Sequence, residues 1–140
     1  MGTMIRAELS EKNKYWISKH RYYELKHFCL QYKAWKQAYL ELTDVGTQRS
    51  VLDGMPSAEG MTADLTARCA VKRAYYAEHI ELIERIAREA DAVLCPYILK
   101  AVTEDISYTC LKMTFHMPCG RDMYYDRYRK FFWLLSNARN

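Results

Sequence analysis

The sequence has few residues that end a helix, with only three prolines and five glycines among 140 residues. Because these residues dominate the turns between short strands, their scarcity argues against an all-β fold with many turns. No stretch approaches the ~20 apolar residues of a membrane-spanning helix, and the N-terminus lacks the apolar run of a signal peptide. We therefore expect a helical, cytoplasmic protein without membrane contact.

The number and spacing of the cysteines argue against a disulfide scaffold and against CxxC motifs. There are five cysteines, an odd number, and none of them form a CxxC pair: Cys29, Cys69, Cys95, Cys110 and Cys119. This usage predicts free thiols in a reducing compartment rather than a disulfide scaffold.

Motifs of enzyme sites are absent as well. The sequence contains no Gly-rich phosphate loop, no GxSxG and no HExxH. Cys110, His116 and Cys119 lie within ten residues, but a structural zinc site needs a fourth ligand that the sequence does not supply. We therefore predict that the protein is not an enzyme and holds no metal or cofactor.

What the sequence does contain is helical periodicity. Half of the residues are hydrophobic, enough for one modest core. From Leu25 to Leu42 the apolar residues recur every three or four positions, which predicts a helix over about 11–42 with room for one break. Residues 43–61 hold three of the five glycines and Pro56, so we expect a loop there. Thr62 is then the expected cap of a helix over 62–90. This division predicts an N-terminal segment and linker over 1–61, with a possible role in dimerisation, and a helical domain over 62–140.

The C-terminal third predicts three further helices, near 95–103, 107–115 and 120–137. Ser107 is a good N-cap, and Pro118 cannot continue the helix that precedes it. A short helix, a tight turn and a longer helix form the outline of a helix-turn-helix. The predicted fold is all-α, with two long helices and a C-terminal helix-turn-helix.

The last helix has two predicted faces. Tyr124, Tyr128, Phe131 and Leu135 share one narrow sector, which we expect to pack on Leu111 and Phe115 of the preceding helix. The remaining faces and borders carry the side chains that we predict to contact DNA, because phosphates attract cations and base edges pair with Arg and polar groups. These are Arg121, Asp122, Tyr125, Arg127, Arg129, Lys130 and Trp133. The competing interpretation is an ordinary amphipathic helix with solvated charges.

Residues 118–135, PCGRDMYYDRYRKFFWLL, carry a family resemblance. They resemble the C-terminal motif of phage and prophage regulators of the ArpU/RinA type, whose helix-turn-helix is similar to region four of sigma factors. Residues 98–108 fit the same pattern, and residues 18–32, SKHRYYELKHFCLQY, resemble small prophage proteins of Gram-positive bacteria. The resemblance implies control of late phage genes in a bacterial host cell. Cys119 and Gly120 depart from it, since Ser or Thr is the more usual cap there, and Asp126 adds a negative charge to the proposed reading face.

The leading hypothesis is therefore a transcriptional regulator that binds double-stranded DNA. The charge distribution agrees, since residues 119–140 carry five Lys/Arg against two acids, whereas residues 62–105 carry six against eight. Because one helix-turn-helix buries a small interface, a second copy or RNA polymerase is an expected partner. The alternatives are a helical protein–protein adaptor of phage origin and a DNA-binding packaging component.

Large aromatic residues in the first helix suggest how two copies would meet. Trp16, Phe28, Trp35 and Tyr39 exceed what one short partner helix could cover, so we expect a helix-mediated homodimer. The competing outcome is a monomer whose long helices pair with each other.

Overall fold

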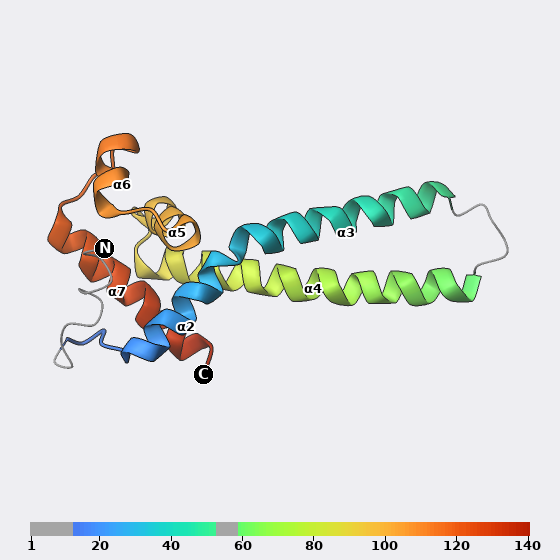
Figure 1. The fold of residues 1–140 in the computed structure, drawn as a ribbon, viewed down its shortest axis with the longest axis horizontal. Coiled ribbons are helices and arrows are strands. Elements are labelled where there is room, and N and C mark those ends of the chain that lie inside the picture. The colour runs from blue at the N-terminus through green and yellow to red at the C-terminus, as the bar shows by residue number, and fades with distance from the viewer. Residues whose placement is uncertain (1–12, 53–58) are drawn as a thin grey trace. The chain divides into compact units, whose positions relative to one another are not determined.

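The computed structural model describes residues 13–52 and 59–140, with the side chains of 13–43 and 64–140. This part of the chain is all-α and contains no strand. Its helices are α2 (Lys19–Leu30), α3 (Tyr32–Leu52), α4 (Glu59–Ala90), α5 (Cys95–Glu104), α6 (Tyr108–Thr114) and α7 (Arg121–Ala138), as shown in Figure 1. None of these helices is long and apolar enough to cross a membrane.

The first predicted helix begins later than expected and is divided. Residues 11–12 lie outside the described residues, and residues 13–18 are not helical. Asn13 forms a local turn instead, with its side-chain oxygen accepting from the Tyr15 amide at 2.8 Å. Ser18 is the true N-cap of α2, since its Oγ accepts from the Arg21 amide at 3.2 Å. The helix breaks at Gln31, whose amide bonds to the Phe28 carbonyl three residues back.

A loop was predicted over 43–61. Residues 53–58 lie outside the described residues, but the chain is helical on both sides of them, so the prediction is wrong there. α3 continues to Leu52, and α4 begins at Glu59, so Thr62 lies inside α4 and is not its cap. A single glycine costs a helix only about 1 kcal/mol, which explains why Gly46 does not end α3. The three C-terminal helices match their predicted bounds closely, with Ser107 Oγ capping α6 at the Cys110 amide and Pro96 in the first turn of α5.

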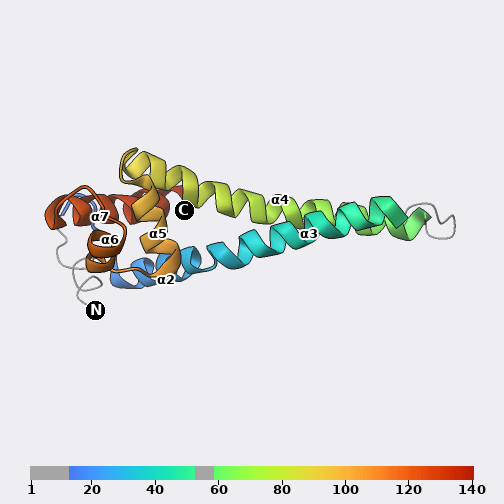
Figure 2. The same ribbon diagram turned by 90° about the horizontal axis from the view of Figure 1, so that it is seen from above.

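The described chain forms two compact units, with residues 13–31 and 82–140 in one and residues 32–81 in the other. The boundary falls inside α4. The second unit is a hairpin in which α3 and the first part of α4 run antiparallel (Figure 2). The functional division predicted at residue 61 remains a prediction.

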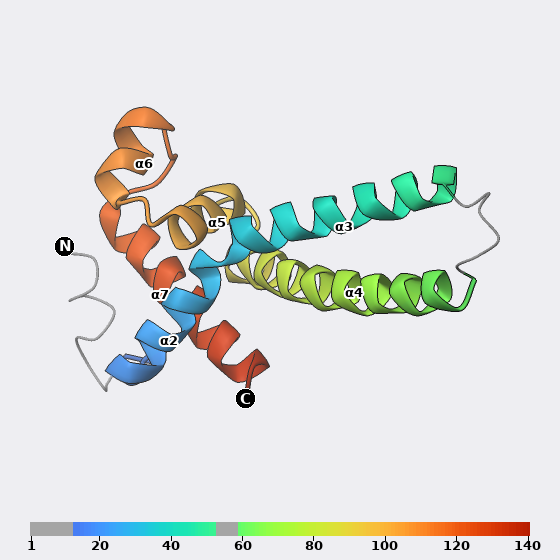
Figure 3. The ribbon, with the colours of Figure 1, turned by 45° about the vertical axis from the view of Figure 1, so that its right-hand side comes forward.

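The first unit holds the main core. α2 packs across both α5 and α7, and α5 also contacts α6 (Figure 3). The core is built from the apolar sides of these helices and the last turns of α4. Its most completely buried side chains are Tyr22, Leu25, Ile83, Ile86, Leu94, Ile98, Leu111, Met117, Tyr124, Phe131, Phe132 and Leu135.

Polar contacts fix α2 on α7 at the edges of this core. The Arg21 guanidinium donates to the Ser136 hydroxyl at 3.0 Å and to the Ser136 carbonyl at 2.9 Å. Near the end of α7, the Arg139 guanidinium lies 3.7 Å from the centroid of the Phe28 ring. Phe28, which the Arg139 guanidinium covers, is buried and therefore unavailable to the dimer interface predicted for it.

Candidate nucleic-acid interface

The connection between α6 and α7 is short and internally bonded. α6 ends at Thr114, and His116 adopts a left-handed conformation with φ of 55°. The Met117 side chain is buried, while its amide bonds to the Leu111 carbonyl at 3.2 Å. The chain therefore turns before Pro118, which cannot donate a helical hydrogen bond, and it re-enters a helix at Arg121.

Lys112 ties this connection to α6. Its Nζ donates to the Met117 carbonyl at 3.1 Å and to the Cys119 carbonyl at 2.8 Å. Two carbonyl groups that the turn leaves outside the helices are thereby satisfied by a side chain. The cation fixes the connection and adds positive charge beside the start of α7.

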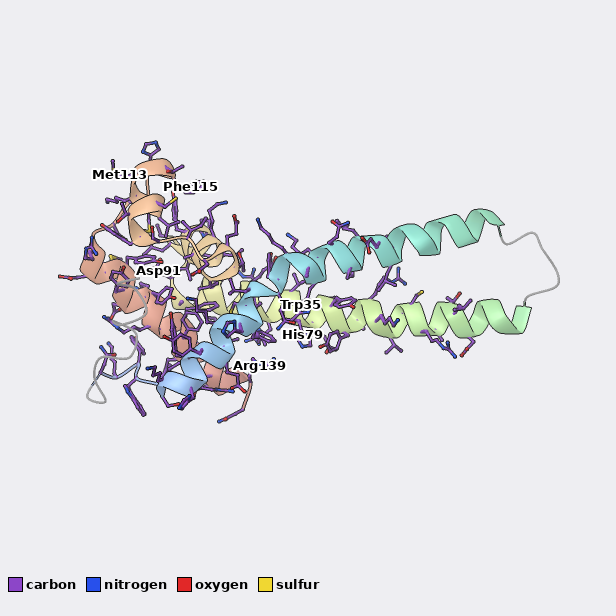
Figure 4. All side chains as sticks on the ribbon, in the orientation of Figure 1. Trp35, His79, Asp91, Met113, Phe115 and Arg139 are labelled. Carbon is purple, nitrogen blue, oxygen red and sulfur yellow. The ribbon has the colours of Figure 1, made fainter. Side chains whose placement is uncertain are left out.

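The core face of α7 agrees with the sequence prediction and extends beyond it. Tyr124, Tyr128, Phe131 and Leu135 are all buried, as predicted. Phe132 is buried too, which widens the face. One expected packing partner is wrong, because Phe115 is 36% exposed and lies under the Lys100 ammonium, 4.7 Å from its ring centroid. Figure 4 shows Phe115 and Met113 at the end of α6.

Tyr125 does not belong to the exposed face on which it was predicted. Its side chain is only 5% exposed, and its ring packs against those of Tyr108, Tyr124 and Tyr128. The buried sector of α7 includes Tyr125 because the Tyr108 ring of α6 packs against it, with ring centroids 6.0 Å apart. Tyr125 is therefore a core residue and not a DNA contact.

Arg127 is occupied within the protein. Its Nε donates to Asp91 Oδ2 at 3.0 Å, and its Nη1 donates to Asp126 Oδ2 at 2.6 Å. Asp91 also accepts from the amides of Val93 and Leu94. Burial acts to raise the pKa of the Asp91 carboxyl, but these hydrogen bonds outweigh it and lower the pKa below its ordinary value. The ion pair joins α7 to the segment between α4 and α5, so Arg127 positions α7.

Trp133 is also partly covered. It is half-buried, and its ring lies 5.6 Å from that of Tyr15, which precedes α2. The segment around Tyr15 therefore lies along the outer side of α7. Trp133 is poorly placed to meet a base.

The remaining predicted residues stay accessible. Arg121 and Asp122 are exposed in the first turn of α7, and Arg129 and Lys130 are half-exposed further along it. Arg121 is also positioned, because its guanidinium lies 4.9 Å from the centroid of the Tyr108 ring on α6. The accessible part of the predicted site therefore runs along α7, from Arg121 and Asp122 in its first turn to Arg129 and Lys130 near its middle.

Comparison of the chain with protein-family models, curated proteins and solved structures finds no match.

Charge distinguishes this end of the protein. Residues 107–140, which contain α6 and α7, carry six Lys/Arg and only two Asp/Glu. Residues 32–81 carry six against seven, so the hairpin is close to neutral. An excess of cations on one helix pair is what a polyanion would meet.

Two residues of this region were not among the predicted contacts. Lys112 was missed because its part in holding the connection depends on where the Met117 and Cys119 carbonyls point. Tyr108 was missed because its approach to Arg121 joins positions thirteen residues apart, and no periodic pattern marks such a pair. The only signal in the sequence was the isolated cation of Lys112 on the polar side of α6.

Proposed function

We propose that this protein binds double-stranded DNA through α6, the connection after it and the accessible side of α7. The observation that supports this most is the cationic excess of residues 107–140 on a short helix, a bonded turn and a longer helix, with Arg121 exposed at the start of the longer one. A recognition helix enters the major groove with its N-terminal residues, and Arg121 and Asp122 are exposed in that part of α7.

The proposed contacts are fewer than the sequence suggested. Arg121, Arg129 and Lys130 are the cations, and Asp122 follows Arg121 in the first turn of α7. Three predicted contacts are no longer proposed. Tyr125 is buried, Arg127 is ion-paired with Asp91, and Trp133 packs against the Tyr15 ring. The resemblance of residues 118–135 to ArpU/RinA-type regulators supports a role in controlling phage genes, with a second copy or RNA polymerase as the partner that extends a small interface.

A triple variant tests the proposal. Replacing Arg121, Arg129 and Lys130 by Ala should weaken binding to duplex DNA and flatten its salt dependence, because each lost phosphate contact removes about 0.9 from the slope of log K against log salt. Fluorescence anisotropy at several salt concentrations measures both quantities. Fragments of the native genome give the probe sequences.

The matched control removes the same charge elsewhere. Lys19, Lys36 and Lys72 are exposed and lie outside α6 and α7, so their triple replacement by Ala lowers the net charge equally. We expect this control to keep most of the affinity and the salt slope. Equal losses in the two triple variants would mean that binding follows net charge alone, and full retention in both would remove α7 from the interface.

An adaptor role is the second candidate, and the hairpin favours it. Leu40 and Val71 are 56% and 70% exposed on α3 and α4, so the hairpin presents apolar groups to a protein partner. Retention on heparin and a steep salt dependence distinguish the DNA binder from the adaptor, which predicts neither.

A further inference from the structure

Three exposed side chains follow one another in the first turn of α7: Arg121, Asp122 and Met123. The next two residues, Tyr124 and Tyr125, are buried, so the exposed run ends at Met123. The three side chains differ in chemistry, since the guanidinium only donates hydrogen bonds, the carboxylate only accepts them, and the methionine is essentially apolar. Cations alone would suffice to hold phosphates, so the other two side chains point to a different contact.

Neither Asp122 nor Met123 is attracted to a phosphate. The Asp122 carboxylate is repelled by the DNA backbone, and the Met123 side chain gains nothing from a nearby charge. The proposed function nevertheless places this turn at the DNA, because a recognition helix enters the major groove with its N-terminal residues. The two side chains are therefore suited to base edges and not to the backbone.

The major groove displays a matching set of groups. Guanine presents two acceptors there, cytosine presents a donor, and thymine presents its 5-methyl group. An arginine pairs with the guanine acceptors, an acidic side chain accepts from the cytosine amino group, and an apolar side chain packs on the thymine methyl group. The first turn of α7 thus carries one side chain for each of the three, and Met123 is the one suited to thymine.

The position of Met123 matters more than its exposure. Met113 of α6 is 72% exposed, against 47% for Met123. Met113 lies near the end of the shorter helix (Figure 4), and the first helix of a helix-turn-helix crosses the DNA backbone instead of entering the groove. Met123 lies on the helix proposed to enter it. Lys130 follows on the same side of α7 after two turns, about 10 Å, so Met123 shares its side with a proposed cation.

We propose that Met123 is a specificity-determining residue that packs against the 5-methyl group of a thymine in the major groove. The inference rests on the proposed function, and it makes recognition depend on sequence through an apolar contact as well as through charge. Because the contact neutralises no phosphate, it contributes to the choice of sequence but not to the salt dependence of binding.

Deoxyuridine in place of thymidine removes this methyl group and leaves the base pairing intact. The probe is the fragment of the native genome that the parent chain binds most tightly, with its thymines replaced by uracil, first together and then one at a time. The parent chain should lose about fourfold in affinity at a thymine within the site, which corresponds to ~0.8 kcal/mol for one buried hydrocarbon group. Met123→Ala should bind the thymine and uracil duplexes equally, with the salt slope of the parent chain.

Two variants serve as matched controls. Met123→Leu keeps an apolar side chain and should still distinguish thymine from uracil. Met113→Ala removes an exposed methionine from α6 and should distinguish the two duplexes as the parent chain does. Circular dichroism should show that each variant retains its helices.

The outcomes separate this inference from the function on which it rests. If the parent chain shows no salt-dependent binding to any fragment, the proposed function fails and the inference fails with it. If the parent chain binds DNA through its cations but binds the thymine and uracil duplexes alike, only the inference is overturned. The same holds if Met123→Ala distinguishes the two duplexes as strongly as the parent chain.

Discussion

The hydroxyl oxygens of Tyr22 and Tyr128 lie 2.8 Å apart in the buried space between α2 and α7. Both rings belong to an aromatic cluster in which the Tyr22 and Phe132 rings meet edge to face with centroids 5.1 Å apart. The pair places a hydrogen bond at the centre of an otherwise apolar contact. Since α7 carries the candidate interface on its other side, this bond helps to fix how the accessible residues of α7 are presented.

Tyr22→Phe should lower the free energy of unfolding by about 1–3 kcal/mol, because the Tyr128 hydroxyl loses its partner while remaining buried. The double variant Tyr22→Phe, Tyr128→Phe should cost less than the sum of the two single variants, since it leaves no orphaned hydroxyl at this contact. Urea unfolding followed by circular dichroism measures all three. Additive losses would show that the two hydroxyl groups do not act as a pair.

The same burial predicts an alkaline limit to stability. Burial raises the pKa of Tyr128 well above its ordinary value of about 10, and burial also raises the pKa of Tyr124. Because the folded state holds these protons more tightly than the unfolded state, the stabilisation is complete below pH of about 10 and is lost as the pH rises further. Tyrosinate absorbance should therefore show a group of phenols that ionise only when the helical circular dichroism signal is lost. Ionisation of all tyrosines before unfolding would contradict this.

The sequence predicted the all-α fold and the last three helices because their signals are local. Ser107 and Pro118 mark their boundaries by their own chemistry, and the buried side of α7 follows a regular period. The first helix was placed too early because polar residues before Ser18, such as Asn13, are equally plausible caps by residue type. The loop after residue 42 was overestimated because Gly46 weakens a helix without ending it.

The site was harder to predict because several elements cover α7 at once. The period of α7 alone would leave Tyr125 exposed, but the Tyr108 ring of α6 packs against it and it is buried. The helical period places Arg127 and Trp133 away from the core face of α7. In the structure, however, Arg127 pairs with Asp91 and Trp133 packs against Tyr15, both of which are distant in the sequence. No regular spacing in the sequence predicts that Asp91 and Tyr15 contact these two residues.

Tyr125→Ala should therefore destabilise the protein strongly, by about 3–5 kcal/mol, because it truncates a buried aromatic side chain. Lys130→Ala should change the free energy of unfolding by no more than about 0.5 kcal/mol, since Lys130 is half-exposed and a solvated cation is readily replaced. Denaturant unfolding of the two variants distinguishes a core position from a surface one. If the Tyr125 substitution has only a small effect on the free energy of unfolding, Tyr125 is not a core residue and the original prediction of an exposed position stands.

The Asp91–Arg127 ion pair should contribute to the free energy of unfolding in a way that is lost in acid. The pKa of Asp91 is lowered in the folded state, so its stabilisation is present above the unfolded pKa of about 3.9 and is lost as the pH falls below it. Asp91→Asn keeps an oxygen that can accept from the Val93 and Leu94 amides but removes the charge. The stability of this variant should therefore decline less steeply than that of the parent chain between neutral pH and pH of about 3. If the stability of the two proteins falls in parallel as the pH is lowered, the ion pair adds nothing beyond the hydrogen bonds from Asp91 to the Val93 and Leu94 amides.

The contact between Arg121 and Tyr108 links α6 to the proposed DNA contact, and it gives the sharpest test of how the interface is built. If the Tyr108 ring positions the guanidinium, Tyr108→Leu should weaken DNA binding several-fold, whereas Tyr108→Phe keeps the aromatic face and should bind as the parent chain does. Arg121→Ala should cost about 1–3 kcal/mol of binding free energy if Arg121 reads a guanine.

The two changes should also depend on each other. In the Arg121→Ala background, Tyr108→Leu should have little further effect, because the group that the ring positions is gone. Anisotropy titrations on the same duplex measure this, with circular dichroism confirming that each variant retains its helices. If Tyr108→Leu weakens binding equally with and without Arg121, then Tyr108 acts on DNA by another route, and Arg121 is held at the start of α7 for a reason other than recognition.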